Sequence, residues 1–350
     1  MRYVDRKGTA VKRYPYLDIA RGIGLLLVII SHSCGLSSYL INYYIPLFFV
    51  VSGYIYKEGR SYRENIGRKA SRLLLPYFGY SAVLLAFYAL LGRNFAETLR
   101  SAFGVLYSRY CLYDTTRSVD NVYLFTVANG AMWYLTAFFV TSLLYHALVD
   151  RCLKSVKFLT ISLAVLTAVT ILLADIPVLL PWSLDLACVG TIFMLAGTFL
   201  GRAGYFEKKT SPLSFLLVLA AYIVLSYCNP GINMSVREYG KYQALSVPLF
   251  ILVGVSGSMI CIWMGKFIQN HFVGTFIGYI GKNTIVLLAF HILGLEIFEM
   301  IAGKVIHISD LTGITFILYH TARISASVCG CLALGFLLDK AKELWRRKRR

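Results

Sequence analysis

Charged residues are scarce in this chain, and no polar stretch is long enough to form a separate soluble domain. They make up 15% of the 350 residues, whereas hydrophobic residues make up 58% and the mean hydropathy is +0.66. An ordinary soluble domain carries about 25% charged residues, so this composition excludes that class. No internal repeat of solenoid period is visible. The sequence therefore predicts one polytopic membrane domain over residues 1–350.

Acidic residues are also few, since 17 Asp and Glu stand against 35 Lys and Arg and the net charge is +18. A basic chain can bind nucleic acid, but membrane topology and attraction to anionic lipid explain this excess better. We expect membrane lipids and no nucleic acid among its partners. The eight cysteines lie mostly in apolar runs without CxxC pairs, so we expect no metal site. Cys111 and Cys228 are expected on the oxidising side, which leaves a single disulfide open.

Apolar runs long enough to cross a bilayer recur along the whole sequence. A spanning helix needs about 20 mainly apolar residues, and charged or Pro- and Gly-containing breaks separate the runs. We expect an all-α fold with ten transmembrane helices. Their ranges are 17–36, 41–56, 73–91, 131–149, 158–174, 182–200, 211–228, 245–265, 284–302 and 313–338.

Basic residues are distributed unequally over the two sides that these ten helices define. The segments on the side of the termini hold 26 Lys and Arg, and the opposite connections hold 7. Because cytoplasmic segments carry the excess of Lys and Arg, both termini are predicted to be cytoplasmic. The longest external connection, 92–130, is rich in tyrosine and in mixed charges. It is either a lid or binding element, or a capped surface loop.

Two ionisable residues, Arg21 and His32, lie inside the first apolar run, where such side chains are costly and mark functional sites. Eleven residues advance a helix by about 16.5 Å and return it to within about 20° of the same face. Asp18 stands one turn before Arg21 on that face. The first helix is therefore predicted to carry a polar stripe, with Arg21 near the cytoplasmic boundary and His32 towards the opposite leaflet.

Five segments of the chain form an ordered set of motifs. The Arg-x10-His spacing of the first helix is a weak pattern alone, but a Phe-Phe-x-x-Ser-Gly second helix and a basic start to the third strengthen it. A Met-Trp-Tyr-Leu stretch and a Gly-Lys-Asn-Thr stretch with a later histidine complete the set. The segments are Leu17–His32, Pro46–Tyr54, Arg68–Tyr77, Met132–Leu135, and Gly281–Thr284 with His291. Together they resemble the membrane-bound acyltransferase-3 family, and within it the short bacterial sugar O-acetylases of the fucose O-acetylase-like subgroup.

The resemblance implies transfer of an acetyl group from cytoplasmic acetyl-CoA to a hydroxyl of a cell-surface or lipid-linked carbohydrate, at the bacterial cytoplasmic (inner) membrane. CoA carries several phosphate charges, so its site needs fixed cations at the cytoplasmic mouth. We expect Arg21, Arg68 and Arg72 to supply them, together with Lys69. For Arg21, a structural ion pair with an orienting Asp18 is the alternative.

His32 is predicted to carry the chemistry. Its imidazole can act as general base on the sugar hydroxyl or accept the acyl group itself, and the sequence does not separate the two. A lone histidine on an apolar face is more often a core residue, but its shared face with Arg21 favours catalysis. Asp185, at the start of the sixth predicted helix, is a candidate orienting partner for His32. The alternative for Asp185 is a helix N-terminal acid stabilised by the helix dipole.

Further residues are expected to line the donor and acceptor sites. Ser52 and Gly53 lie low in the second helix, where they contact the pantetheine or phosphates of CoA or serve close helix packing. Trp133 and Tyr134 stack on a sugar or belong to the aromatic belt of the membrane interface. The remaining candidates are His291 and Arg323 for the substrate cavity, and Asn283 with Lys282 for the cytoplasmic mouth.

Two other classes of function fit a polytopic chain with buried charges. A transporter or flippase for a sugar or lipid-linked glycan is the main rival, but such proteins commonly contain paired repeats with interrupted helices. None is evident here, and the cytoplasmic arginine cluster fits a CoA donor better. A sensor or scaffold would leave Arg21 and His32 unexplained. The acceptor sugar, and acetyl against a larger acyl group, stay open.

Overall fold

The computed structural model describes residues 3–4, 10–11, 14–35, 37–92, 94–113, 121–124, 130–208, 210–234, 242–304 and 311–348. Over these residues the regular structure is almost entirely helical. The exception is a pair of two-residue strands, β1 (Tyr3–Val4) and β2 (Ala10–Val11), which run antiparallel. The prediction of an all-α fold is confirmed.

Every predicted apolar run contains a helix. The α-helices are α1 (Pro15–Cys34), α2 (Pro46–Tyr54), α3 (Tyr62–Leu90), α4 (Phe95–Tyr107), α5 (Trp133–Lys154), α6 (Val156–Ala174), α7 (Ala187–Arg202), α8 (Pro212–Cys228), α9 (Ser246–Ile268), α10 (Phe272–Lys282), α11 (Thr284–Ala302) and α12 (Gly313–Lys348). Short 3-10 turns precede three of them: η1 (Gly130–Met132) before α5, η2 (Pro181–Leu186) before α7 and η3 (Gln243–Leu245) before α9.

Eight of the helices in the described part of the chain are long and apolar enough to cross a membrane. They are α1, α3, α5, α6, α7, α9, α11 and α12, with η1, η2 and η3 extending the three that follow them. Helix α8 is also apolar but has 17 residues. The chain is therefore polytopic, as predicted, although the number of long spans is smaller than ten.

Helix α2 accounts for the clearest departure from the ten predicted spans. The prediction extends it over 41–56, but the helix begins at Pro46, after turns at 38–45, and has nine residues. Proline fits the first turn of a helix because its missing N–H would have no partner there. Nine residues rise about 13.5 Å, which is less than half of a hydrocarbon core of about 30 Å. Helix α2 alone is therefore too short to cross.

Two helices lie outside the predicted runs. Helix α4 starts in the 92–130 connection, where the Asn94 side chain accepts a hydrogen bond from the backbone N–H of Glu97 at 2.8 Å. This is an N-cap, which satisfies a backbone donor at the helix start. Helix α10 follows α9 closely and packs along α1. Both are too short to be recognised as membrane spans.

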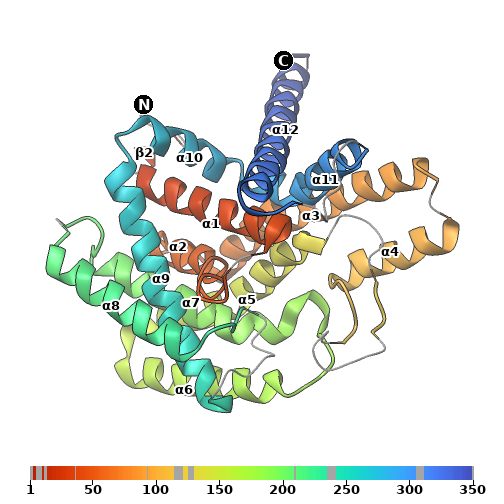
Figure 1. Ribbon diagram of the computed structural model, residues 1–350. Helices are drawn as coiled ribbons and strands as arrows, with labels where there is room; N and C mark the ends of the chain where they lie inside the picture. The colour runs from red at the N-terminus through yellow and green to blue at the C-terminus, as the bar shows by residue number, and fades with distance from the viewer. Residues whose placement is uncertain are drawn as a thin grey trace.

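Helix α1 lies at the centre of the molecule. It packs against α2, α9, α10, α11 and α12, and Figure 1 shows it surrounded by these elements. In the same view both chain ends lie along the upper edge, and α12 projects beyond the other helices. The apolar window that contains α7 is 72% buried, whereas that of α6 is 17% buried. Helices α1 and α7 are therefore interior, and α6 is peripheral.

Glycines bring α2 and α7 into backbone contact. A Cβ atom on Gly53 would collide with the carbonyl of Met194, and one on Gly197 would collide with the carbonyl of Val50. Small residues allow helices to approach closely where no hydrophobic effect drives them together. Of the two interpretations of Gly53 that the sequence leaves open, the structure supports helix packing.

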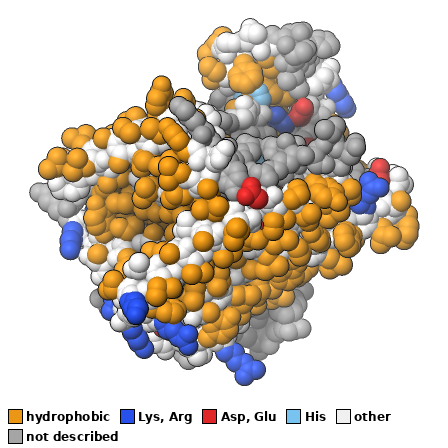
Figure 2. Space-filling view, turned by 90° about the horizontal axis from the view of Figure 1, so that it is seen from below, with side chains coloured by type: hydrophobic (Ala, Val, Ile, Leu, Met, Phe, Trp, Pro, Cys, Tyr) orange, Lys and Arg blue, Asp and Glu red, His pale blue; other side chains and the backbone are white. Residues whose placement is uncertain are grey.

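Much of the outer surface is apolar. Large side chains such as Leu90, Phe95 and Phe272 are more than 80% exposed. Figure 2 shows one face covered mainly by hydrophobic side chains, with Lys and Arg gathered at its margins. An apolar band of this kind suits contact with lipid, with basic residues reaching the headgroups.

Candidate functional site

A cavity of about 370 Å³ lies between the helices. Its walls come from α1, α2, α5 and α11 and from the connections after α4 and α8. His32, Trp133 and Tyr134 contribute to the lining, as do Arg109 and Thr284. Small-molecule sites commonly have volumes of about 300–1,000 Å³. The cavity is therefore large enough for a sugar ring.

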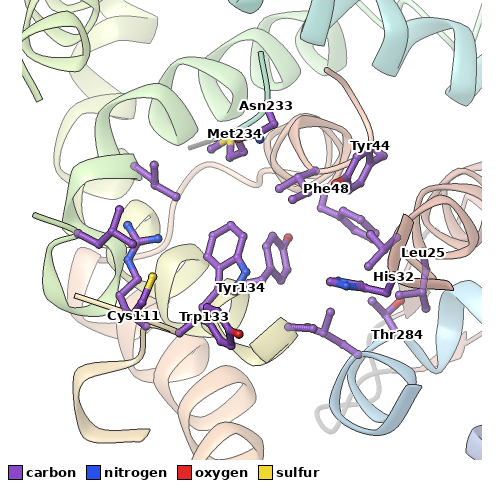
Figure 3. A pocket seen from close by; sticks show the side chains of 18 residues that line it. Leu25, His32, Tyr44, Phe48, Cys111, Trp133, Tyr134, Asn233, Met234 and Thr284 are labelled. Carbon is purple, nitrogen blue, oxygen red and sulfur yellow. The ribbon is translucent and has the colours of Figure 1, made fainter. Parts of the chain in front are cut away.

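His32 is the ionisable residue of α1 that faces this cavity. It lies in the last turn of α1, and its ring points towards Trp133 and Tyr134 in Figure 3. Trp133 and Tyr134 begin α5 and are half-buried within the molecule. Because both line the cavity, the structure favours the substrate-site interpretation over an aromatic belt at the membrane interface.

His291 packs behind His32. The two ring centroids are 5.3 Å apart, with an angle of 48° between the planes. His291 is 0% exposed, and its Nδ1 lies 2.8 Å from the carbonyl oxygen of Leu287 and 3.1 Å from that of Leu288. Its Nε2 has no hydrogen-bond partner among the described residues. His291 therefore lies against the site but does not line the cavity, which corrects its predicted role as a substrate contact.

Asp185 forms a buried ion pair with Arg109. The Arg109 Nη2 donates to Asp185 Oδ1 at 2.5 Å, and Arg109 Nε donates to the Leu180 carbonyl at 3.2 Å. The guanidinium carbon also lies 5.8 Å from the centroid of the Trp133 ring. A carboxylate held this way satisfies a buried cation. The predicted partnership of Asp185 with His32 is therefore replaced: Asp185 positions Arg109, and the imidazole beside His32 is that of His291.

A strained turn directs Asp185 inward. Trp182 and Ser183 in η2 have φ values of 54° and 58°, in the left-handed region that non-glycine residues rarely adopt. The Trp182 Nε1 donates to the Leu106 carbonyl at 2.8 Å, and the Tyr107 hydroxyl donates to the Leu179 carbonyl at 2.8 Å. These bonds join η2 to the end of α4. Such strain persists only where surrounding contacts fix it, often beside a functional site.

The described part of the 92–130 connection contributes directly to the cavity. Arg109, Tyr110 and Cys111 line it, whereas residues 114–120 and 125–129 fall outside the described ranges. Burial raises the pKa of Tyr110, and the neighbouring Tyr123 adds to this effect. The Tyr110 hydroxyl is therefore protonated at neutral pH and able to donate a hydrogen bond. The structure favours the binding-element interpretation of this connection. No disulfide joins any of the eight cysteines, all of which lie in the described ranges, and the Cys111 thiol donates to the Tyr113 carbonyl at 3.0 Å.

A second cluster, the cation cluster, consists of Arg21, Lys69 and Arg72. The Lys69 Nζ donates to the Ser52 hydroxyl at 3.1 Å and lies 4.6 Å from the centroid of the Phe138 ring. The positive charges of Arg21 and Arg72 both act on Lys69. Like charges repel Lys69 here, although Asp18 offsets part of the Arg21 charge, and a bound anion would relieve the remaining repulsion. Ser52, predicted to contact the donor, therefore belongs to the cation cluster through Lys69.

The other predicted donor residues have local partners. Arg21 Nη1 lies 3.4 Å from Asp18 Oδ1, so this pair exists and Asp18 orients Arg21. Arg68 is exposed and lies 4.0 Å from Glu64 on the helix surface. Asn283 follows the last residue of α10, and its side-chain amide donates to the Tyr279 carbonyl at 2.9 Å. A contact of Arg68 or Asn283 with the donor stays a prediction.

Tyr134 lies next to both the cavity lining and the cation cluster. It lines the cavity with His32, packs against Phe138 with centroids 5.5 Å apart, and lies within electrostatic reach of Arg21. The described residues that line the cavity include His32 and Tyr134 but not Arg21. The helical spacing predicts a continuous passage from Arg21 to His32, and Tyr134 is a residue that such a passage would run beside.

Arg323 connects helices instead of lining the cavity. Its guanidinium donates to the carbonyls of Ser33 at 3.1 Å and Leu295 at 3.3 Å and forms an ion pair with Glu299. These contacts join α12 to α1 and α11. The predicted substrate-binding role of Arg323 is therefore corrected to one of helix packing, because its donors are used by backbone and carboxylate acceptors.

The sequence did not single out Arg109. Its position in a tyrosine-rich external connection gave a weak signal for a binding element, but its partner Asp185 is 76 residues away. An ion pair over that separation depends on the tertiary fold.

Comparison with known proteins gives one match. A family model described as an acyltransferase domain matches residues 14–336, which contain both the cavity and the cation cluster. No curated protein and no solved structure matches the chain.

Proposed function

The chain belongs to the acyltransferase-3 family, and we propose that it is an O-acyltransferase that moves an acetyl group from acetyl-CoA to a hydroxyl of a carbohydrate. It is a multi-pass membrane protein. We assign it to the bacterial cytoplasmic membrane, with the donor bound from the cytoplasm and a cell-surface or lipid-linked glycan bound on the opposite side. A transporter or flippase for such a glycan is the alternative.

One observation carries the proposal. His32 faces a cavity with aromatic walls, and a cluster of three cations lies behind one of those walls, at Tyr134. A donor with phosphates at one end and a thioester at the other requires cations and a proton acceptor at separate places. Arg21 and His32 lie eleven residues apart on one helix, a rise of about 16.5 Å. That separation suits the pantetheine arm of CoA.

The cation cluster suits the phosphate end of the donor. Guanidinium groups bind phosphate in a fork-like geometry, and lysine adds a point charge. Arg21 and Arg72 supply the two guanidinium groups, and both act electrostatically on Lys69. The Tyr134 ring lines the cavity and lies within electrostatic reach of Arg21, so the thioester would pass beside it on the way to His32.

The cavity suits a sugar. Trp133 offers a ring face on which the apolar face of a sugar can stack, and Arg109 beside it is fixed by Asp185. The Arg109 Nη1 is not used in the ion pair and can donate to sugar hydroxyls. Tyr110 adds another hydroxyl at the cavity wall.

In the proposed reaction, the sugar hydroxyl oxygen bonds to the thioester carbonyl carbon while the bond between that carbon and sulfur breaks. His32 takes the proton from the hydroxyl and then returns it to the sulfur. The products are the sugar ester and the free thiol of CoA, so atoms and charge balance. A positioned general acid–base group typically accelerates such a transfer by about 100- to 10,000-fold.

The experiment uses the purified full chain in proteoliposomes, supplied with acetyl-CoA and a panel of soluble and lipid-linked oligosaccharides. Mass spectrometry should find acetyl groups on at least one glycan class with the wild-type protein and none with the folded His32→Gln variant. Movement of an unmodified glycan across the bilayer, without ester formation, would support the transporter instead and contradict the proposal.

A further inference from the structure

We propose that His291 is a positioning residue for His32: its Nε2 accepts a hydrogen bond from one ring nitrogen of His32 and leaves the other ring nitrogen free as proton acceptor. This inference rests on the proposed function, because it assigns a partner to the residue proposed to carry the chemistry. It names a role that differs from substrate contact.

The first observation concerns the burial of His291 and the position of its ring proton. It is fully buried in α11, and its Nδ1 lies 2.8 Å from the Leu287 carbonyl oxygen. A carbonyl oxygen can only accept, so Nδ1 carries the proton. In an imidazole with one proton, Nε2 is then a hydrogen-bond acceptor. The proton assignment follows from the hydrogen-bond pattern.

The second observation is that this acceptor has no partner among the described residues. Buried polar atoms are hydrogen-bonded in the great majority of cases, and an exception requires an explanation. Leaving a buried acceptor without a donor is unfavourable. The carbonyls of Leu287 and Leu288 hold Nδ1 and so orient the ring, while the Ser327 hydroxyl donates to the backbone carbonyl of His291 at 2.8 Å.

The third observation is that the His32 ring lies next to the His291 ring. The His32 ring centroid lies 5.3 Å from that of His291, at an angle of 48°. The torsion that turns a histidine ring has a broad energy profile, so a modest rotation brings a His32 N–H towards Nε2. Hydrogen bonds of catalytic groups are often long before substrate binds and tighten in the complex.

This arrangement would determine which nitrogen of His32 does the chemistry. The His32 N–H that faces His291 stays bonded there throughout the reaction. The opposite nitrogen, on the cavity side, takes the hydroxyl proton and later returns it to sulfur. His291 gains and loses no proton, so its part is to hold the His32 ring in one tautomer and orientation.

The tautomers can be measured without any substrate. The chain has six histidines, so the protein labelled with ¹⁵N-histidine in nanodiscs gives a small set of ring signals, with His32 and His291 identified by their loss in His32→Gln and His291→Phe. We expect His291 to carry its proton on Nδ1 and His32 to hold one tautomer. A proton on Nε2 of His291 in the wild-type protein would overturn the proposal; the two variants serve only to assign the ring signals.

Variants then test the role in turnover. His291→Phe keeps the ring volume and removes the acceptor, and we expect kcat to fall about 100-fold with little change in KM for either substrate. His291→Gln places an amide oxygen near the Nε2 position, and we expect it to recover part of kcat. In His291→Phe the His32 signal should split between two tautomers.

The matched control is His320→Gln. His320 Nδ1 lies 3.0 Å from the hydroxyl of Ser33, the residue after His32, and its ring packs on Phe316 and Tyr319. We expect this variant to keep the His32 tautomer and kcat within about twofold. An equal loss of kcat in both variants, or a wild-type kcat in folded His291→Phe, would reject the positioning role. Because acetyl transfer by the wild-type protein is measured separately, these outcomes are distinguishable from failure of the proposed function.

Discussion

Buried ionisable side chains have two different roles in this molecule. Arg109 and Arg323 are held by carboxylates and backbone carbonyls, so each is compensated within the fold. Lys69 has cations for electrostatic neighbours, since the charges of Arg21 and Arg72 both act on it. Compensated charges stabilise a structure, whereas a group of like charges favours an anionic ligand. This difference separates packing residues from candidate donor contacts.

Replacement of Arg72 by alanine should weaken CoA binding. A hydrogen bond to a charged group contributes about 1.5–3 kcal/mol, and about 1.4 kcal/mol corresponds to tenfold in Kd. We therefore expect Arg72→Ala to raise the Kd of CoA at least about tenfold in calorimetry. Arg63→Ala is the control, because Arg63 is an exposed cation of the same helix. Equal affinities for wild type and Arg72→Ala would reject the phosphate site.

The sequence predicted part of the candidate site. The common face of Arg21 and His32 follows from helix geometry alone, and the Trp133–Tyr134 pair was recognisable from its motif. Partners across helices were not predictable. The expected depth of Asp185 suggests His32 as its partner, but in the fold Arg109 from a distant connection forms an ion pair with Asp185. The apposition of His32 and His291 likewise depends on how α1 and α11 pack.

At the scale of elements, the contact between α2 and α7 affects the cation cluster. Gly53 and Gly197 let the two backbones meet, and Ser52, next to Gly53, reaches Lys69. Packing of α2 therefore affects both the fold and the position of a cation. A substitution at Gly53 therefore alters the packing of α2 first, and binding of the donor only as a consequence.

Gly53→Ala should destabilise the protein. Its Cβ would meet the Met194 carbonyl, a backbone atom that cannot move alone, and overpacking of this kind costs about 1–3 kcal/mol. We expect a lower thermal unfolding midpoint in detergent. Gly67→Ala is the matched control, because no atom lies near its Cβ position in α3 and alanine favours a helix by about 0.5–1 kcal/mol. An unchanged midpoint in Gly53→Ala would contradict the close contact.

Most helices were predictable because an apolar run of about 20 residues has few alternatives in a membrane. The exceptions have local causes. Pro46 sets the start of α2 and leaves 38–45 in turns, which hydropathy does not register. Helices α4 and α10 are short, and α4 depends on the Asn94 cap. The bounds of these three helices depend on helix length and on residues at the helix start, whereas the other helices follow from hydropathy.

At the scale of the whole molecule, sidedness remains a prediction from the distribution of Lys and Arg. The segments on the side of the termini hold 26 of them against 7 on the other side. A green fluorescent protein fused to the C-terminus should fluoresce in bacterial cells, and an alkaline phosphatase fused there should be inactive. Active phosphatase at the C-terminus would reverse the orientation and place the cation cluster away from CoA.

Donor binding and chemistry are assigned to different positions along α1. Arg21 and its neighbours are assigned to the donor phosphates, and His32 is assigned to the reacting carbonyl and hydroxyl. His32 lines the cavity and Arg21 does not, so phosphate binding and chemistry are assigned to separate places. Separate places imply that the two functions can be removed independently.

The most direct measurement compares acetyl turnover and CoA affinity in wild type and His32→Gln. The account predicts that turnover falls at least about 100-fold, as for loss of a general base, while the Kd of CoA from calorimetry stays within about twofold. Wild-type turnover by the folded His32→Gln variant would contradict the assignment of the chemistry to this residue.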